Sequence, residues 1–526
     1  MKRRAFIKAI GAGAAWASIP FFRSQAEPLG QFFRLNPLIE ALPDAVFIMR
    51  TQISDKHDEA AKYKAGRKFA STVFIEASAD DGLPVTRKIV LKPNLTSRGK
   101  WQRGYTIERS MGVVTDALFV EGIIDGMKPL GLGGDSFFIR EVNGIENLTE
   151  GGYGALAART GADVRIISTP VDSLSPDQVV WKDVPEGIWF KKIPYLWPVN
   201  APDTFLINIA KFKSHGMGMT LCAKNLQGTI AANYQQHCTL LQNEMSIDPA
   251  HVQPNAKKTI QNNYQRHAAA GIPRWDRPGA DGGLWQETWA TRCLDNNSIL
   301  KADLHIIEAL YGHDGNFIEG PHDGFAADFM TNLIIFGKNP FHVDIIGTWL
   351  AGHEPGNFGL FHMAVERGMS SFLDPFAVPL YEWFEDGKVE VKSLTSLERT
   401  PLVTYYLRRD YNGQSEPLWH LVNEPYDYSK SAVTQNEKRP AAFALSPAFP
   451  NPFNSNTSLV ASLPHTGHFD AKVYNLSGQL IDILVDGRLE GQHVIRWNAD
   501  DKPSGIYFLK ASFNGQTISR RLFLLR

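Results

Sequence analysis

The chain of 526 residues contains few cysteines and almost no excess charge of either sign. Its three cysteines, Cys222, Cys238 and Cys293, form no C-x-x-C pair, which excludes a disulfide scaffold, a zinc ribbon and a self-contained iron–sulfur module. With 54 basic and 55 acidic residues, the net charge is -1, so no global field attracts nucleic acid. We therefore expect neither an iron–sulfur cluster nor a nucleic-acid partner.

Long apolar runs are also missing. The longest near the N-terminus, residues 9–22, is too short and too rich in glycine and alanine for a membrane span. Basic residues precede it and a small-x-small site, Ser24-Gln25-Ala26, follows, which indicates an export signal peptide over 1–26. The string RRAFIK (3–8) resembles the twin-arginine export signal, with a Sec signal or a short anchor as the alternatives. No transmembrane span is expected in the mature chain.

The 43% hydrophobic content is enough for a large core and excludes wholesale disorder. The length predicts several domains. We expect the signal peptide to be followed by an α/β body (27–430), a polar linker (431–446) and a C-terminal β-sandwich (447–526).

The C-terminal segment has short alternating apolar runs separated by Gly, Pro, Asn and Asp, which predicts a small immunoglobulin-like β-sandwich. Its motifs PNPFN (450–454), KVYNLSGQ (472–479) and SGIYF (504–508) resemble the C-terminal sorting domain of the type IX secretion system. A generic immunoglobulin-like stalk is the alternative. The resemblance implies export through both membranes to the cell surface or beyond, with the export machinery as partner.

The body alternates buried-strand patterns with helical ones, which predicts an α/β domain with a largely parallel sheet and flanking helices. The expected strands are 86–91, 163–167, 204–209, 304–307 and 333–336, and a helix is expected within 113–127. Polar residues that follow strands of such a sheet form its binding crevice. The polar, aromatic stretch 242–289 indicates an irregular insertion near the mouth of that crevice.

The candidate site residues follow these strands or a glycine turn. The predicted catalytic residues are His215, Lys213 and Asp135, and the predicted ligand-binding residues are Lys92, Asn94, Lys224 and Asn225. Lysines suit an anionic carboxylate or phosphate, and a histidine transfers protons near neutral pH. Each residue also has a plainer interpretation: the lysines as solvated surface groups, Asp135 as a helix cap, His215 as a loop histidine.

Several blocks resemble domain-of-unknown-function family 362 (DUF362) over roughly residues 86–370. They include LKPN (91–94), GGDS (133–136), INIAKFKSH (207–215), AKNLQG (223–228) and FHVDIIGTWLAG (341–352). Glu308 stands where the family usually has an aspartate. The resemblance implies no settled activity.

A fainter resemblance links the order His215, Lys224, His237 to the nickel-pincer lactate racemases. It implies an acid–base role for His215, a cofactor-binding role for Lys224 and a metal-ligand role for His237. The repeated HDG motif (313–315 and 322–324) adds His313 and Asp314 as candidate ligands of a divalent ion, with a polar loop as the alternative. Glu308, in the strand run that precedes the motif, is a further candidate ligand. The cofactor stays open between a divalent metal and a nucleotide-type group.

Two functions follow from these observations. The first is an exported enzyme of unknown reaction that binds a small anionic substrate or cofactor, with a racemase-like metal enzyme as a variant. The second is a non-catalytic surface protein for ligand binding or adhesion.

Overall fold

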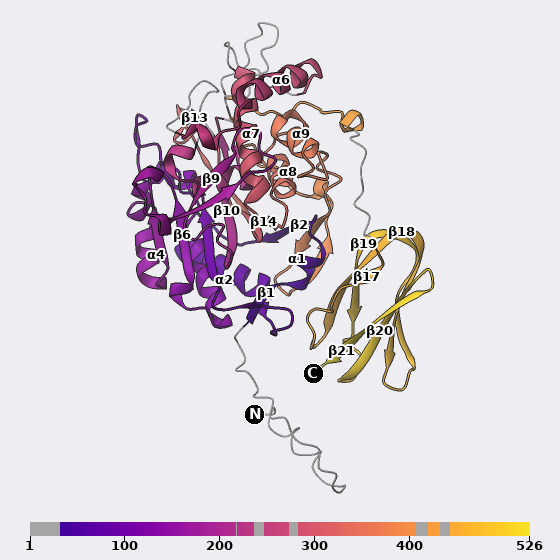
Figure 1. Cartoon of the computed structure of the whole chain (residues 1–526). Coiled ribbons are helices and arrows are strands. Elements are labelled where there is room, and N and C mark those ends of the chain that lie inside the picture. The colour runs from indigo at the N-terminus through magenta and orange to yellow at the C-terminus, as the bar shows by residue number, and fades with distance from the viewer. Residues whose placement is uncertain are drawn as a thin grey trace.

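The computed structural model describes residues 32–216, 218–235, 247–272, 282–404, 419–431 and 442–525. Figure 1 shows an α/β body followed by a smaller unit of yellow C-terminal strands. Two minor sheets accompany the main sheet of the body. They are β1 (Phe32–Leu35) with β3 (Phe74–Glu76) and β4 (Leu83–Pro84), and β8 (Val179–Asp183) with β9 (Lys192–Leu196).

The main sheet has ten strands in the order β16-β15-β2-β14-β12-β10-β5-β6-β7, with β11 paired to β10. The strands are β2 (Val46–Arg50), β5 (Lys88–Pro93), β6 (Phe137–Glu141), β7 (Asp163–Ile166), β10 (Thr204–His215), β11 (Gly218–Thr220), β12 (Leu304–His313), β14 (Asp328–Gly337), β15 (Leu380–Trp383) and β16 (Val389–Val391). From β7 to β12 all neighbours are parallel, whereas β14 is antiparallel to both β12 and β2. The α/β fold class is confirmed, and the sheet as a whole is mixed.

Two central strands are longer than the sequence predicted. The strand expected at 204–209 continues to His215, and the one expected at 304–307 continues to His313. The cause is pairing beyond the end of β5: β11 folds back on β10, and β14 accompanies β12 to its end. The expectation that the polar residues of these segments follow the strands is therefore wrong, because they lie within them.

Helices cover both faces of the sheet. Because side chains alternate along a strand, Phe47 and Met49 of β2 join one core while Val46 and Ile48 join the other. The first core lies under α2 (Glu59–Val73), α3 (Ala117–Met127) and α4 (Tyr153–Thr160). The second lies under α8 (Pro340–Leu350) and α9 (Gly359–Glu366). The sheet is thus buried on both faces, as a parallel sheet requires.

Two further helices lie at the end of the body away from β1: α6 (Ala256–Ala269) and α7 (Gly282–Ile299) (Figure 1). The expectation of irregular structure across 242–289 is wrong for these segments. Polar α7 residues are buried because they have partners: Glu287 lies 3.0 Å from His267, and Asp295 accepts hydrogen bonds from the backbone N–H groups of Trp189 and Phe190. Because polar and charged side chains occupy buried positions of α7, its sequence lacks the apolar stripe that predicts a helix.

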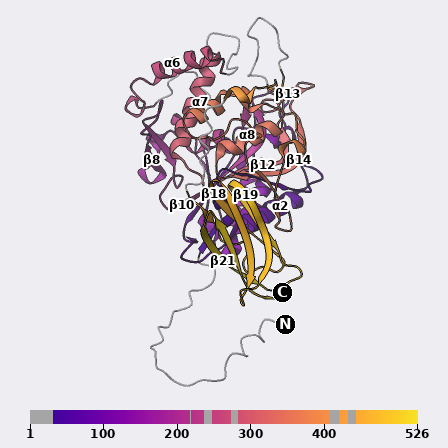
Figure 2. The ribbon, with the colours of Figure 1, turned by 90° about the vertical axis from the view of Figure 1, so that its right-hand side faces the viewer.

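The C-terminal unit is antiparallel and consistent with a β-sandwich. Its strands are β17 (Ala444–Leu445), β18 (Asn456–Asn475), β19 (Leu480–Asn498), β20 (Gly505–Phe513) and β21 (Gln516–Leu524). Phe469, Trp497 and Leu509 are buried in its own core. The unit lies against the body near α1 (Pro37–Ala41), where Gln492 donates to the Ala41 carbonyl (Figures 1 and 2). Within the described ranges, every helix is too short or too polar to cross a membrane.

Candidate functional site

The alternation of β10 brings three basic side chains to one face of the strand. In KFKSH, Lys211, Lys213 and His215 stand two residues apart, and Phe212 between them joins the core on the other face. The neighbouring strand β5 contributes Lys92 and is followed by Asn94 at the same edge of the sheet. Lys213, His215, Lys92 and Asn94 were predicted from the sequence, but the common direction of Lys213 and His215 that the alternation sets was not.

Lys92 is fully buried and forms an ion pair with Glu141 at the end of β6. Its Nζ lies 2.7 Å from Glu141 Oε2, and it also donates to the Pro93 carbonyl and to Asn225 Oδ1. Burial lowers the pKa of Lys92 despite the nearby carboxylate, and the charge of Lys224 lowers it further. Sequence analysis missed Glu141, although it ends the strand run FFIRE and so meets the same criterion as the residues chosen.

Asn225 joins the two strands through its side chain. Its Oδ1 also accepts from Asn94 Nδ2 at 3.2 Å, and its Nδ2 donates to the Lys92 carbonyl and to Asn208 Oδ1, each at 2.8 Å. Among the described residues, no donor reaches the buried Oδ1 of Asn94. Asn94 therefore offers an acceptor next to the lysines.

Lys92, Lys213, His215 and Lys224, which we call the cationic cluster, are linked electrostatically through Lys224, whose charge acts on both Lys92 and His215. Burial and the charges of Lys224 and Lys213 place the pKa of His215 well below its usual 6.5, so its imidazole is neutral at pH 7. His215 and Lys224 are half-buried, whereas Lys213 is buried. Within the described part of the chain, the Lys224 ammonium has no hydrogen bond or ion pair.

Asp344 on α8 holds the backbone that carries Lys224 and Asn225. Its carboxylate accepts hydrogen bonds from the N–H groups of Cys222 and Ala223, at 2.7 and 2.8 Å, at the start of α5 (Cys222–Asn225). Burial raises the pKa of Asp344 to about 7. Asp344 lies in the block FHVDIIG (341–347), and its role was not predicted from the sequence. Cys222, like Cys293, is a buried free thiol, and Cys238 lies outside the described residues.

Lys211 lies on the same strand face but forms an ion pair of its own. Its Nζ is 2.9 Å from both carboxylate oxygens of Glu308, and both side chains are fully buried. Glu308 also accepts from the backbone N–H groups of Asp116 and Leu310, and burial raises its pKa to about 7. The hydrogen bonds of Glu308 given by the described residues all join it to groups inside the body, so the Lys211–Glu308 pair stabilises the sheet.

The other predicted metal ligands also have separate partners. His313 lies 2.7 Å from Asp328 through Nδ1 and 2.5 Å from the Phe317 carbonyl through Nε2. Asp314 contacts His322 Nε2 at 2.8 Å and accepts from the Ala327 N–H. The part of the chain that the structure describes holds no group of three or more His, Cys, Asp or Glu residues able to bind a metal ion. His237 lies outside that part.

Asp135 is not brought to the cluster. It is exposed and stands just before β6, which pairs in parallel with β5 in the register Ile89↔Phe137. It therefore lies at the edge of the sheet where these strands begin, opposite the edge that carries Lys92 and Glu141. The acid that the structure places beside the lysines is Glu141.

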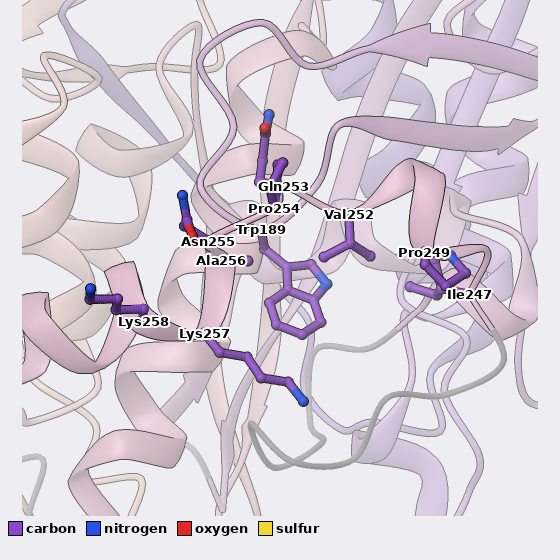
Figure 3. A pocket seen from close by; sticks show the side chains of 10 residues that line it. All are labelled: Trp189, Ile247, Pro249, Val252, Gln253, Pro254, Asn255, Ala256, Lys257 and Lys258. Carbon is purple, nitrogen blue, oxygen red and sulfur yellow. The ribbon is translucent and has the colours of Figure 1, made fainter.

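A separate cavity of about 450 Å³ lies where α6 begins (Figure 3). The Trp189 ring and the Lys257 side chain line it together with Val252. None of the residues predicted from the sequence lines this cavity, so it is distinct from the cationic cluster.

Gly228 of the AKNLQG block permits the close approach of its backbone to Glu141. A Cβ at this position would lie 2.0 Å from Glu141 Oε1, so Gly228→Ala must displace the carboxylate that pairs with Lys92. We expect a loss of about 1–3 kcal/mol in the free energy of unfolding, measured by urea denaturation. Gly487→Ala, where a Cβ meets no atom within 4 Å, is the control and should change stability by less than about 0.5 kcal/mol. Equal effects of the two substitutions would contradict this account.

The fold and site define an exported protein with an α/β body and a C-terminal sorting domain, as comparison with family models shows. Residues 447–524 match the secretion system C-terminal sorting domain, which directs the chain to the cell surface or out of the cell. Residues 89–349 match the family model of the domain of unknown function DUF362. A search of curated proteins finds no match. Both family resemblances noted in the C-terminal segment and the body are confirmed.

Proposed function

We propose that this exported DUF362 protein is an enzyme that binds a small anionic molecule at the cationic cluster and uses His215 for proton transfer. Support comes from the surroundings of Lys224. Its ammonium acts on Lys92 and on His215, yet it has no ion-pair partner among the described residues. The Glu141 carboxylate is already bonded to Lys92. A carboxylate or phosphate would offset the remaining positive charge.

The chemistry assigned to His215 follows from its neutral state. Burial and two nearby ammonium groups disfavour the imidazolium, so in the free protein the His215 imidazole is neutral and has a lone pair that can accept a proton. A bound anion opposes those charges and raises the pKa of His215 toward neutrality, where a general base is most effective. The basicity of His215 therefore depends on whether the anion is bound.

Export by the twin-arginine pathway is part of this proposal, supported by RRAFIK at residues 3–8. That route carries folded proteins.

Binding is tested by calorimetric titration of the purified full chain with inorganic pyrophosphate. We expect Lys224→Met to weaken binding at least about tenfold, the scale of one lost charge-assisted hydrogen bond. Lys338→Met is the matched control: Lys338 is also half-buried but follows β14 at the opposite edge of the sheet. Unchanged affinity in Lys224→Met, or an equal loss in both variants, would overturn the site.

Catalysis is tested separately by incubating the chain with phosphorylated and carboxylated metabolites and following conversion by mass spectrometry. We expect His215→Gln to retain pyrophosphate binding and to lose turnover. Binding without any turnover by the unmodified chain would favour the non-catalytic surface protein instead.

A further inference from the structure

An aromatic pair, Trp101 and Phe317, lies next to the cationic cluster. The two ring centroids are 4.9 Å apart at an interplanar angle of 71°. The Phe317 ring also lies near His215, with centroids 6.2 Å apart, and near Lys213, whose Nζ lies 5.6 Å from the ring centre. The pair therefore extends from the cluster outward.

Trp101 is 65% exposed, the third-highest value among the exposed large hydrophobic side chains of the described residues. Large aromatic side chains usually contribute to a core or an interface, and an indole ring in water is a surface on which another ring can stack. Phe317 lies near both Trp101 and His215. The exposed Trp101 ring is therefore separated from the cationic cluster by one side chain.

The loops that carry the pair are fixed in place. Gln102, 8% exposed, donates to the Asn316 carbonyl at 3.1 Å and accepts from the Ile318 N–H at 2.9 Å, so the residues beside Trp101 and Phe317 are bonded directly. Ser214 donates to the Gly315 carbonyl and thereby ties the Phe317 loop to β10. The pair is held before any ligand arrives, which reduces the entropy cost of binding.

The backbone at both loops is adapted to this arrangement. Gly99 has a φ of +82°, and a Cβ there would lie 2.9 Å from Phe317 Cβ. Phe317 itself has a φ of 55°, a left-handed conformation that bulky residues rarely adopt, and its carbonyl is 2.5 Å from His313 Nε2. His313, predicted as a metal ligand, thus helps to orient Phe317. Strained backbone of this kind concentrates at ligand sites.

We propose that the ligand of the cationic cluster carries a flat aromatic or heteroaromatic ring joined to its anionic group, as in a nucleotide, and that Trp101 stacks on this ring. The inference rests on the proposed function, because the cluster must hold the anion. Stacking on an aromatic side chain tolerates different rings, whereas the lysines require the charge. Trp101 is a specificity-determining residue in this arrangement.

The experiment compares ADP, inorganic pyrophosphate and adenosine by calorimetric titration of the full chain. We expect ADP to bind about tenfold more tightly than pyrophosphate, and adenosine to bind weakly. Trp101→Ala should remove the ADP advantage and leave pyrophosphate affinity unchanged, while Trp101→Phe should keep most of it. Trp181→Ala, at another exposed tryptophan, is the control and should change neither affinity.

The results separate this inference from the proposed function. Equal affinities for ADP and pyrophosphate, or an ADP advantage that survives Trp101→Ala, would overturn the stacking role while Lys224-dependent pyrophosphate binding still upheld the anion site. Pyrophosphate binding that does not depend on Lys224 would overturn both.

Discussion

Through Glu308 alone, the free energy of unfolding is expected to fall by about 3 kcal/mol as the pH rises from 4.5 to 7. Burial raises the pKa of this carboxyl from its ordinary 4.5 to about 7 in the folded chain. Between these values the folded state binds more protons than the unfolded state, so stability decreases with increasing pH. The stabilising contribution is complete below pH 4.5 and is lost by about pH 7.

Urea denaturation at a series of pH values measures this slope. Asp344 contributes a slope of the same sign, because burial also raises its pKa to about 7. The informative quantity is therefore the difference between the unmodified chain and Glu308→Gln, which removes the titrating group and keeps the shape. Glu385→Gln, at an exposed position, should leave the slope unchanged. If Glu308→Gln also left it unchanged, burial would not raise the pKa of Glu308 above its ordinary value.

The second large effect is expected at the buried pair of Lys92 and Glu141. Glu141→Leu leaves the Lys92 ammonium without its carboxylate in the interior, which should cost about 3–5 kcal/mol of unfolding free energy. Adding Lys92→Met should recover most of that loss, because two apolar side chains of similar volume replace two charges. A complete double-mutant cycle by urea denaturation gives the coupling between them. Additive effects of the two substitutions would show that the charges do not interact.

The sequence was sufficient to predict the α/β body and the sorting domain, because the patterns that indicate them lie within short segments of the chain. Ile89–Leu91 is continuously apolar and only His305 interrupts Leu304–Ile307, a pattern typical of strands covered on both faces. The lengths of β10 and β12 could not be predicted in this way. They depend on pairing with β11 and β14, and Lys211 and Glu308 tolerate the interior only because the register Lys211↔Glu308 places them side by side.

The candidate site shows the same division. Lys92, Lys213 and His215 were predicted from their positions after apolar runs, and Lys224 and Asn225 from the AKNLQG block further along the chain. In the structure the charge of Lys224 acts on Lys92 and His215, and Asn225 accepts a hydrogen bond from Lys92. Asp135 was misplaced because a glycine turn leads into a strand as readily as out of one. Glu141 and Asp344 were missed because their roles come from partners distant in sequence, Lys92 and the start of α5. Tertiary contacts decide such roles, and one sequence does not display them.

The central claim is that burial and the charges of Lys224 and Lys213 hold His215 neutral until an anion binds. It is tested most directly by NMR titration of the imidazole in the full chain labelled at histidine, with the His215 signal among the 15 histidines assigned by its absence in His215→Gln. We expect His215 to stay neutral well below pH 6.5 in the free protein, to gain a proton at higher pH once pyrophosphate is added, and to do the same without ligand in Lys224→Met. Titration near pH 6.5 that responds to neither pyrophosphate nor Lys224→Met would contradict the account.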